Sequence, residues 1–145
     1  MPEVSYVRAT DPFPLESAED TKLHAFYARL GEGRLTTTAC ADCRRTAWPP
    51  RGFCPECGSD RFDWVDLPSE GVVHAFTVLE TGVPARFESP RIFAIVKVDA
   101  HRIFSVLVGV DPSRVALGQR VRLNPMKIAD DPRGQPRWLP AFTLI

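Results

Sequence analysis

The chain has 145 residues, of which 44% are hydrophobic and 25% charged, as is typical of a globular protein with one domain or two small ones. Lysine plus arginine equals aspartate plus glutamate, 18 against 18, so the formal net charge is zero. This balance argues against a dedicated nucleic-acid-binding protein, which usually carries a basic excess. No apolar run approaches the ~20 residues of a membrane span, and the N-terminus lacks the basic and apolar parts of a signal peptide. We therefore expect a cytoplasmic protein without a membrane partner.

Residues 1–33 are expected to form an arm and a docking helix. Three prolines interrupt residues 1–15, which show no apolar period and predict an extended arm that lies on the body or on a partner. Residues 17–30 predict a helix, in which Ser17 and Asp20 resemble a weak capping box. Gly31 and Gly33 supply the end of this helix.

One face of this helix carries an apolar stripe with the spacing i, i+3, i+4 and i+7. The stripe consists of Leu23, Phe26, Tyr27 and Leu30. It either packs on the core of its own chain or docks on a partner, and both readings stay open.

Residues 34–62 contain all four cysteines of the chain, as two C-x-x-C pairs with ten residues between them. The cysteines are Cys40, Cys43, Cys54 and Cys57. Each pair can present two thiolates from a tight turn, and two such knuckles complete a tetrahedral Zn²⁺ site. The layout of strand, knuckle, strand and knuckle predicts a zinc ribbon of the rubredoxin type. Iron remains an alternative to zinc, and a closed four-sulfur site predicts a structural role.

From residue 71 onward short apolar runs alternate with turns, and five of these runs predict strands. They are residues 71–80, 92–99, 102–109, 120–124 and 137–144. Ala100 and His101 fit a two-residue hairpin loop, and residues 111–113 start a turn or one short helical turn. Five strands with a longer excursion between the third and the fourth predict an OB-type barrel over residues 63–145. The expected fold is thus mainly β: an N-terminal helix, a rubredoxin-like zinc ribbon and a five-stranded OB-fold barrel.

A second site is expected at the seam between ribbon and barrel, where aromatic side chains could stack a flat ring and arginines could hold phosphates. The candidate residues are Arg44, Trp48, Arg51, Phe53 and Phe76. The plainer role of the ribbon arginines, which include Arg45, is to offset the negative charge of the metal–thiolate centre. Most of the aromatic residues are expected in the core.

The sequence contains few candidate catalytic residues. No cysteine remains free, and His24, His74 and His101 fall in different predicted elements. Of the three, only His74 could face a site, and a lone histidine on a strand is more often a packed residue. The acidic pairs at 19–20 and 130–131 occupy capping and turn positions.

The order and content of these motifs resemble a known family with an N-terminal helix, a rubredoxin-like zinc ribbon and a C-terminal OB-fold, long filed as a domain of unknown function. The resemblance covers roughly residues 20–145 and rests on the segments 26–35, 40–43, 49–51, 54–59, 71–78 and 107–112. It implies zinc as the metal held by the four cysteines. It also implies a non-catalytic subunit or scaffold that accompanies thiolases, hydroxymethylglutaryl-CoA synthases, lipid-transfer-protein-type aldolases or acyl-CoA hydratases, with the OB-fold holding the CoA part of an acyl-CoA.

The favoured hypothesis is therefore an accessory subunit in lipid, steroid or polyketide-type acyl-CoA metabolism. A single-stranded nucleic-acid-binding module is the alternative, because zinc ribbons and OB-folds both occur in such proteins. An independent enzyme or electron carrier is the third hypothesis, and it is disfavoured because no nucleophile or acid–base pair was found.

Overall fold

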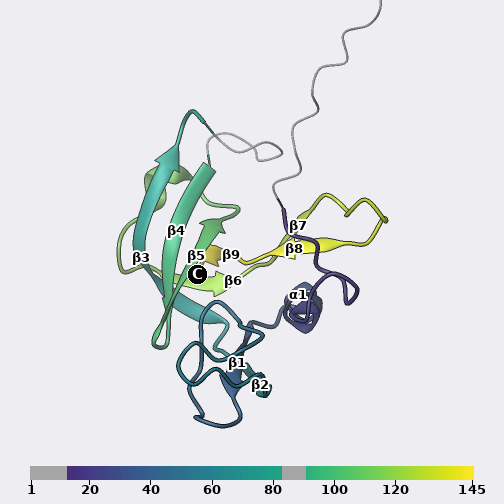
Figure 1. Cartoon of the computed structure of the whole chain (residues 1–145). Helices are drawn as coiled ribbons and strands as arrows, with labels where there is room; N and C mark the ends of the chain where they lie inside the picture. The colour runs from purple at the N-terminus through teal and green to yellow at the C-terminus, as the bar shows by residue number, and fades with distance from the viewer. Residues whose placement is uncertain (1–12, 83–90) are drawn as a thin grey trace, which may run out of the picture.

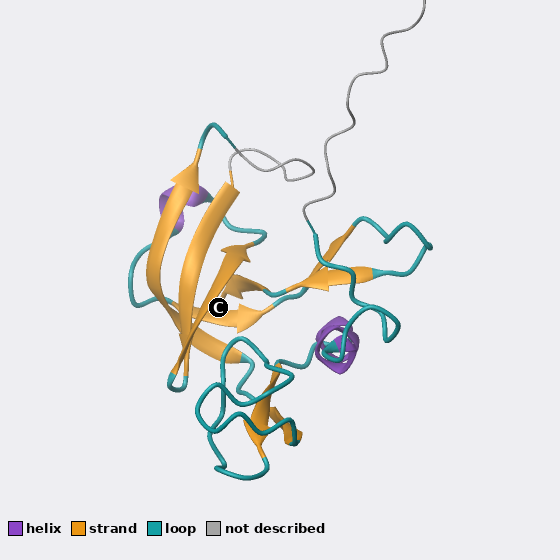
Figure 2. Ribbon diagram, in the orientation of Figure 1, coloured by secondary structure: helices purple, strands orange, loops and turns teal. Residues whose placement is uncertain are grey.

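The computed structural model describes residues 13–82 and 91–145 of the chain. This part contains one α-helix, a two-stranded ribbon, a closed barrel and a short two-stranded hairpin, in which β-structure dominates (Figures 1 and 2). The expected mainly β fold with one helix, a ribbon and a five-stranded barrel is confirmed.

The helix α1 (His24–Gly31) is shorter than the predicted span of residues 17–30. Ser17 and Asp20 form an isolated turn, in which the Ser17 hydroxyl donates to an Asp20 carboxylate oxygen at 2.6 Å. Arg133 donates to the same carboxylate at 2.9 Å and 3.1 Å, so the side chain that was expected to cap the helix is held elsewhere. The prediction of the helix was right, and its predicted beginning was wrong.

The ribbon consists of β1 (Thr36–Cys40) and β2 (Phe62–Asp66), which pair antiparallel from Thr36↔Asp66 to Cys40↔Phe62. Threonines fill β1, and their β-branched side chains suit a strand. Arg34 extends this pairing with a bidentate ion pair to Asp66 at 2.9 Å. The segment between the two strands carries the two knuckles.

The barrel closes in the strand order β3-β4-β5-β9-β6, with β6 returning to β3. Its strands are β3 (Glu70–Leu79), β4 (Arg91–Val98), β5 (His101–Leu107), β6 (Arg120–Leu123) and β9 (Ala141–Leu144). All neighbours are antiparallel except β5 and β9, which run parallel. In the connection between β5 and β6, Pro112–Arg114 form the expected short helical turn, η1.

Two local features shape this barrel. Gly71 is required where β3 crosses β4, because a Cβ atom there would lie 2.5 Å from the backbone oxygen of Lys97. The β4–β5 hairpin turns at Asp99 and Ala100, and Asp99 adopts a φ of 50°. The predicted loop, Ala100 with His101, was therefore wrong by one residue, because Val98 pairs directly with His101.

The predicted last strand, residues 137–144, is in fact two strands. Arg137–Leu139 form β8, which pairs with β7 (Met126–Ile128) outside the barrel, whereas β9 enters the barrel between β5 and β6. Pro140 separates them, because proline has no backbone N–H to donate to a ladder. The prediction of one continuous strand was wrong for this reason.

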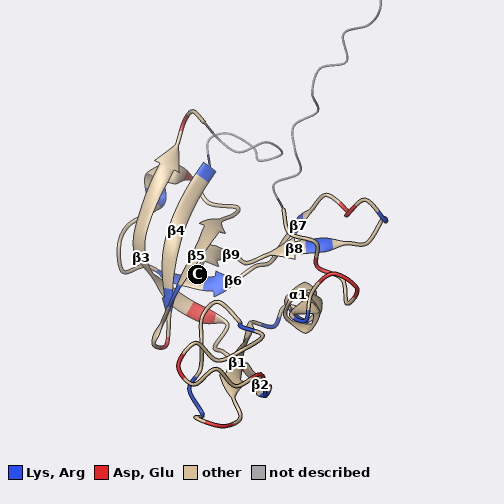
Figure 3. Cartoon of the chain, in the orientation of Figure 1, with Lys and Arg blue, Asp and Glu red and all other residues tan. Residues whose placement is uncertain are grey.

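Residues 13–20 lie against the β7–β8 hairpin, and Arg137 fastens them there. Its guanidinium is fully buried and donates to the carbonyl oxygens of Phe13 and Pro14 at 3.4 Å each and of Ala129 at 2.9 Å. Figure 3 shows acidic positions in the segment before α1 and basic positions in the neighbouring hairpin. The end of the predicted arm that the structure describes thus lies on the body, and residues 1–12 lie outside the described residues.

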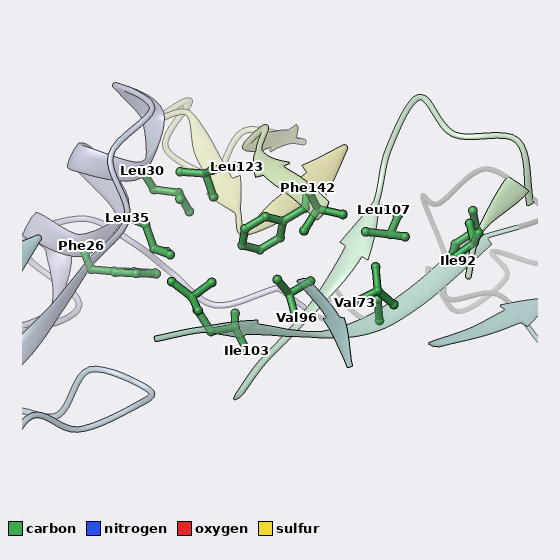
Figure 4. Packing of buried hydrophobic residues seen from close by; sticks show 14 residues of the cluster. Phe26, Leu30, Leu35, Val73, Ile92, Val96, Ile103, Leu107, Leu123 and Phe142 are labelled. Carbon is green, nitrogen blue, oxygen red and sulfur yellow. The ribbon is translucent and has the colours of Figure 1, made fainter. Parts of the chain in front are cut away.

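A single hydrophobic core joins α1, the start of the ribbon and the barrel. Phe26 and Leu30 of α1 meet Leu35, which precedes β1, and beyond them lie barrel residues such as Val96 and Phe142 (Figure 4). Leu30 and Val96 are fully buried. The helix and the ribbon are therefore packed parts of one structural unit with the barrel.

Candidate functional site: a four-cysteine metal centre and three surface hollows

The four cysteines meet at one point of the ribbon. Their Sγ atoms all lie within 4.8 Å of one another, and the pairs Cys40–Cys57 and Cys43–Cys54 approach to 3.6 Å and 3.5 Å. Tetrahedral coordination with Zn–S bonds of about 2.3 Å requires sulfur–sulfur separations of about 3.8 Å. All four cysteines are free thiols, and the donor set fits one Zn²⁺ ion. The ion would tie the two knuckles together.

The two knuckles have the same pattern of backbone hydrogen bonds. In the first, the Cys40 N–H donates to the Arg45 carbonyl and the Arg44 N–H donates to the Cys40 carbonyl, both at 2.9 Å. In the second, the Cys54 N–H donates to the Ser59 carbonyl and the Gly58 N–H donates to the Cys54 carbonyl. The pattern places each cysteine pair on a tight turn, as their spacing predicts.

These turns also point backbone N–H groups at sulfur. The Cys43 N–H lies 3.4 Å from Cys40 Sγ, and this hydrogen bond is the main reason why the pKa of Cys40 falls to about 6. The corresponding N–H of Cys57 lowers the pKa of Cys54. Both interactions favour the thiolate, which is the form that binds metal.

A group of polar contacts that the sequence analysis missed fixes the first knuckle to the residues just before β2. The Asp42 carboxylate accepts hydrogen bonds from the Arg61 guanidinium and the Ser59 hydroxyl, and these two contacts lower the pKa of Asp42. Arg61 also lies close enough to Cys40 to offset part of the thiolate charge. Among the arginines expected in that role, Arg45 instead forms an ion pair with Glu56 at 2.9 Å.

The predicted ligand residues are brought together only in part. Trp48, Arg51 and Phe53 line one hollow of about 220 Å³ beside the knuckles. Phe53 is 58% exposed. Arg44 lies outside the lining of this hollow, and Phe76 pairs with the buried Ala94 and packs against the barrel core.

The helix stripe divides into buried and accessible residues. Phe26 and Leu30 are buried in the core of their own chain, which accounts for half of the stripe without a partner. Leu23 and Tyr27 remain partly exposed, and together with Trp48 they line a second, larger hollow of about 460 Å³ between helix, ribbon and barrel. The docking role of the stripe stays a prediction that now rests on Leu23 and Tyr27.

Two barrel phenylalanines extend the apolar surface beyond this second hollow. Phe104 of β5 is 69% exposed and stacks on Phe93 of β4, with ring centroids 5.8 Å apart. Both line a shallow depression with Phe76. Most aromatic residues were expected in the core, and the exposed Phe104 is an exception to that expectation.

The histidines do not assemble a catalytic site. His74 occupies a bulge in β3 and is exposed, whereas His24 lies on α1 and contacts the Thr21 carbonyl. His101 Nε2 lies 3.4 Å from the Thr46 hydroxyl and links the barrel to the ribbon. The structure also contains a third hollow, lined by Glu16, that no sequence motif indicated. In the part of the chain that the structure describes, no helix is long and apolar enough to cross a membrane.

Comparisons with known proteins agree with this architecture. Residues 28–63 match the family described as "ChsH2, rubredoxin-like zinc ribbon domain", and residues 64–124 match "ChsH2, C-terminal OB-fold domain". A solved structure named "Ltp2-ChsH2(DUF35) aldolase" is 29% identical, covers 83% of this chain and 91% of that chain, and superposes with a TM-score of 0.69.

Two further relatives extend the comparison. A protein of Thermomonospora curvata named "Probable enoyl-CoA hydratase alpha subunit" is 32% identical over 68% of this chain, and the chain spans 31% of its length. A DUF35 protein of unknown function from Sulfolobus solfataricus is 14% identical, covers 83% of each chain and superposes with a TM-score of 0.55, a likeness that shows the fold alone. The metal ribbon, the closed barrel and these matches together show that the chain belongs to the ChsH2/DUF35 family of zinc-ribbon and OB-fold proteins.

Proposed function

We propose that this chain is a non-catalytic subunit of an acyl-CoA enzyme complex, in which it docks on a thiolase-like, aldolase or hydratase partner. The observation that carries the proposal is the match of helix, ribbon and barrel, in the same order, to the ChsH2 part of an aldolase named with two components. The metal centre supports it, because four thiolates close the coordination sphere and leave no position for a substrate. The complex would act in lipid, steroid or polyketide-type acyl-CoA metabolism in the cytoplasm.

The docking surface that we propose is the apolar junction between helix, ribbon and barrel. Leu23 and Tyr27 contribute from α1, Trp48 from the ribbon and Phe104 from the barrel. Aromatic residues are enriched at the centres of protein interfaces, and the exposed ring of Phe104, stacked on Phe93, offers a partner apolar area to bury.

We further propose that the ribbon hollow holds the nucleotide end of CoA. Trp48 and Phe53 offer flat faces for the adenine ring, and the guanidinium of Arg51 offers donors to a phosphate. Arg44 and Phe76 lie outside this hollow, so their predicted roles in ligand binding are not part of the proposal.

Calorimetric titration of the zinc-loaded chain with CoA tests the ligand part. Arg51→Ala and Phe53→Ala should each weaken binding about tenfold, since each removes one charge-assisted or stacking contact. Arg122→Ala is the matched control, because Arg122 is an exposed cation that faces Glu70 on the barrel. Equal affinities for all four proteins would contradict the assignment of this hollow.

The nucleic-acid alternative is favoured by one observation, the stacked pair of Phe93 and Phe104 on the outer face of β4 and β5. In OB-folds these second and third strands often bind oligonucleotides. Fluorescence titration with a single-stranded oligonucleotide at low salt separates the two functions. Salt-sensitive binding that Phe104→Ala abolishes would favour the alternative over the acyl-CoA complex.

A further inference from the structure

A hollow of about 400 Å³ lies between the segment before α1, the helix itself and the β7–β8 hairpin. Its wall includes two acidic residues, Glu16 and Asp131, and two aromatic residues, Tyr27 and Trp138. None of the described residues that line it is a lysine or an arginine. The hollow is separate from the metal centre and from the ribbon hollow, and it shares Tyr27 with the hollow between helix, ribbon and barrel.

Glu16 is buried in this wall with half of its carboxylate unused. Its side chain is only 5% exposed, and its Oε1 accepts a hydrogen bond from the backbone N–H of Trp138 at 2.8 Å. Its Oε2 is covered and has no hydrogen-bond partner. A buried carboxylate with a missing partner costs stability, so such groups tend to occur where something else supplies the contact.

Asp131, also 5% exposed, is the second acceptor. Its Oδ1 accepts from the backbone N–H groups of Arg133 at 2.8 Å and Gln135 at 2.9 Å. Among the hydrogen bonds between described residues, none uses its Oδ2. Among the described residues, each carboxylate therefore has one oxygen without a hydrogen bond, and Glu16 Oε2 is covered, so a cation in the hollow reaches it only after the carboxylate rotates.

The two arginines near the hollow, Arg137 and Arg133, donate hydrogen bonds to other groups. Arg137 donates to the carbonyl oxygens of residues 13, 14, 129 and 130. Arg133 donates to the Asp20 carboxylate and lies 3.3 Å from Glu19. Both arginines still act on the two carboxylates through space, since Arg137 lowers the pKa of Glu16 and Asp131 raises the pKa of Arg133. They offset part of the negative charge of the hollow, but neither donates a hydrogen bond to Glu16 Oε2.

A metal ion does not fit this charge. In the described part of the chain, the four cysteines form the only group of three or more histidine, cysteine or acidic side chains close enough to hold an ion. Glu16 and Asp131 lack a third such ligand. The complementary group is therefore an organic cation whose stem can lie against the rings of Tyr27 and Trp138.

We propose that this hollow is a docking pocket for one lysine or arginine side chain of the partner subunit, with Glu16 and Asp131 as its acceptors. The proposal rests on the proposed function, because it names a contact of the same subunit complex. A cation that enters gives Glu16 Oε2, after a small rotation of the carboxylate, the partner that the chain itself does not provide.

The affinity of the pocket should depend on pH. Burial raises the pKa of Glu16 to about 7, against the lowering effects of the Trp138 N–H and of Arg137. The other ionisable groups around Glu16 are His24 and Tyr27 of α1, Asp20 before the helix, and Asp131 and Arg133 of the hairpin loop. Since the carboxylate is charged above its pKa, cation binding should strengthen as the pH rises through about 7.

The first experiment titrates the zinc-loaded full chain with n-butylguanidinium, a mimic of an arginine side chain, and follows the indole N–H signal of Trp138 by NMR. We expect a saturable shift, and none with the neutral isostere N-butylurea. Glu16→Gln keeps an acceptor for the backbone N–H of Trp138 and should weaken binding of the cation about tenfold. Glu32→Gln, an exposed control, should leave the affinity unchanged. Equal titration of wild type and Glu16→Gln, or no saturable shift of the wild type, would overturn the pocket.

If the Glu16→Gln variant fails to fold, two other measurements test the pocket. Asp131→Asn should weaken binding in the same direction, and the wild type should bind more weakly at a pH below the pKa of Glu16 than above it. If neither holds, the pocket is likewise overturned.

The second experiment compares the dissociation constants of the partner complex formed by the wild type, Glu16→Gln and Glu32→Gln. A weaker complex for Glu16→Gln alone supports the docking role, and equal constants for all three overturn it while the proposed function stands. If no partner complex forms at all, the proposed function fails, whereas the fragment titration still decides whether the pocket binds cations.

Discussion

At the scale of single residues, backbone conformation in the knuckles distinguishes two equivalent positions. Arg44 and Gly58 each follow the second cysteine of a pair, and both adopt positive φ, 64° and 76°. Glycine takes this conformation without strain, but an arginine pays for its Cβ atom. The first knuckle thus carries strain that the second lacks.

We predict that Arg44→Gly stabilises the metal-loaded chain by about 1 kcal/mol, because it removes the left-handed strain. Gly58→Ala should destabilise it by a similar amount. Chemical denaturation of the zinc-loaded proteins measures both. A loss of stability in Arg44→Gly would show that the guanidinium contributes more than the strain costs.

Glu16 makes the folding stability of the chain depend on pH. Its pKa is raised in the folded chain to about 7 from an ordinary value of 4.5, chiefly by burial, so the native state binds more protons than the unfolded state between these values. Its contribution to stability is fully present below pH 4.5 and is lost as the pH rises through about 7.

Glu16→Gln should therefore stabilise the chain by about 1 kcal/mol above the pKa of the glutamate, and leave it nearly unchanged in acid. Denaturation curves at several pH values test this expectation, with Glu32→Gln as the exposed control. A constant difference between Glu16→Gln and wild type across the pH range would contradict the raised pKa.

At the scale of elements, the contact between α1 and β8 depends on one glycine. Gly31 is the last residue of α1, and a Cβ atom there would lie 2.7 Å from Trp138 Nε1. Replacement of glycine by alanine normally stabilises a helix by about 1 kcal/mol. Here the clash reverses the sign.

Gly31→Ala should consequently destabilise the chain by about 1–3 kcal/mol, with a change in the fluorescence of Trp138. Gly52→Ala is the matched control, because a Cβ atom at that position would meet only Lys22 Cδ at 4.0 Å. Thermal unfolding of both variants gives the comparison. Equal stability of Gly31→Ala and wild type would mean that the helix and the hairpin separate easily.

Elements with a strong local pattern could be predicted, and those set by distant contacts could not. The alternating burial of β4 and the paired cysteines are local signals, so the barrel strands and the metal centre followed from the sequence. The helix start depends on Arg133, which holds Asp20 from 113 positions away. The buried Glu16 depends on Trp138, 122 positions away, and its hollow had no local signature.

At the scale of the whole molecule, the ribbon and the barrel share one core but have separate sources of stability. The barrel closes its own hydrogen-bond ladders, whereas the knuckles have little apolar burial, so we expect their stability to depend on a bound metal. The fold class could be predicted from sequence because the barrel strands and the cysteine pairs each have a local pattern. The placement of four residues around one hollow could not, because it depends on how helix, ribbon and barrel pack together. These residues are Leu23, Tyr27, Trp48 and Phe104.

Removal of the metal should therefore unfold the knuckles and leave the barrel folded. Hydrogen exchange after chelation should show loss of protection at the amides of Cys40 and Cys54, which bond within the knuckles, while the amides of β4 stay protected. Readdition of Zn²⁺ should restore the protection. Equal loss of protection in β4 would show that the metal stabilises the whole chain as one cooperative unit.

The central claim is that this chain is a docking subunit rather than an enzyme by itself. Its most direct test is co-expression with a thiolase-like, aldolase or hydratase protein from the same organism, followed by measurement of the molar mass of the purified complex and of its activity on acyl-CoA. The account predicts a stable complex that contains both chains, with activity that the isolated chain lacks and that Phe104→Ala lowers through weaker association. A chain that elutes alone under these conditions, or that turns over acyl-CoA without its partner, would contradict it.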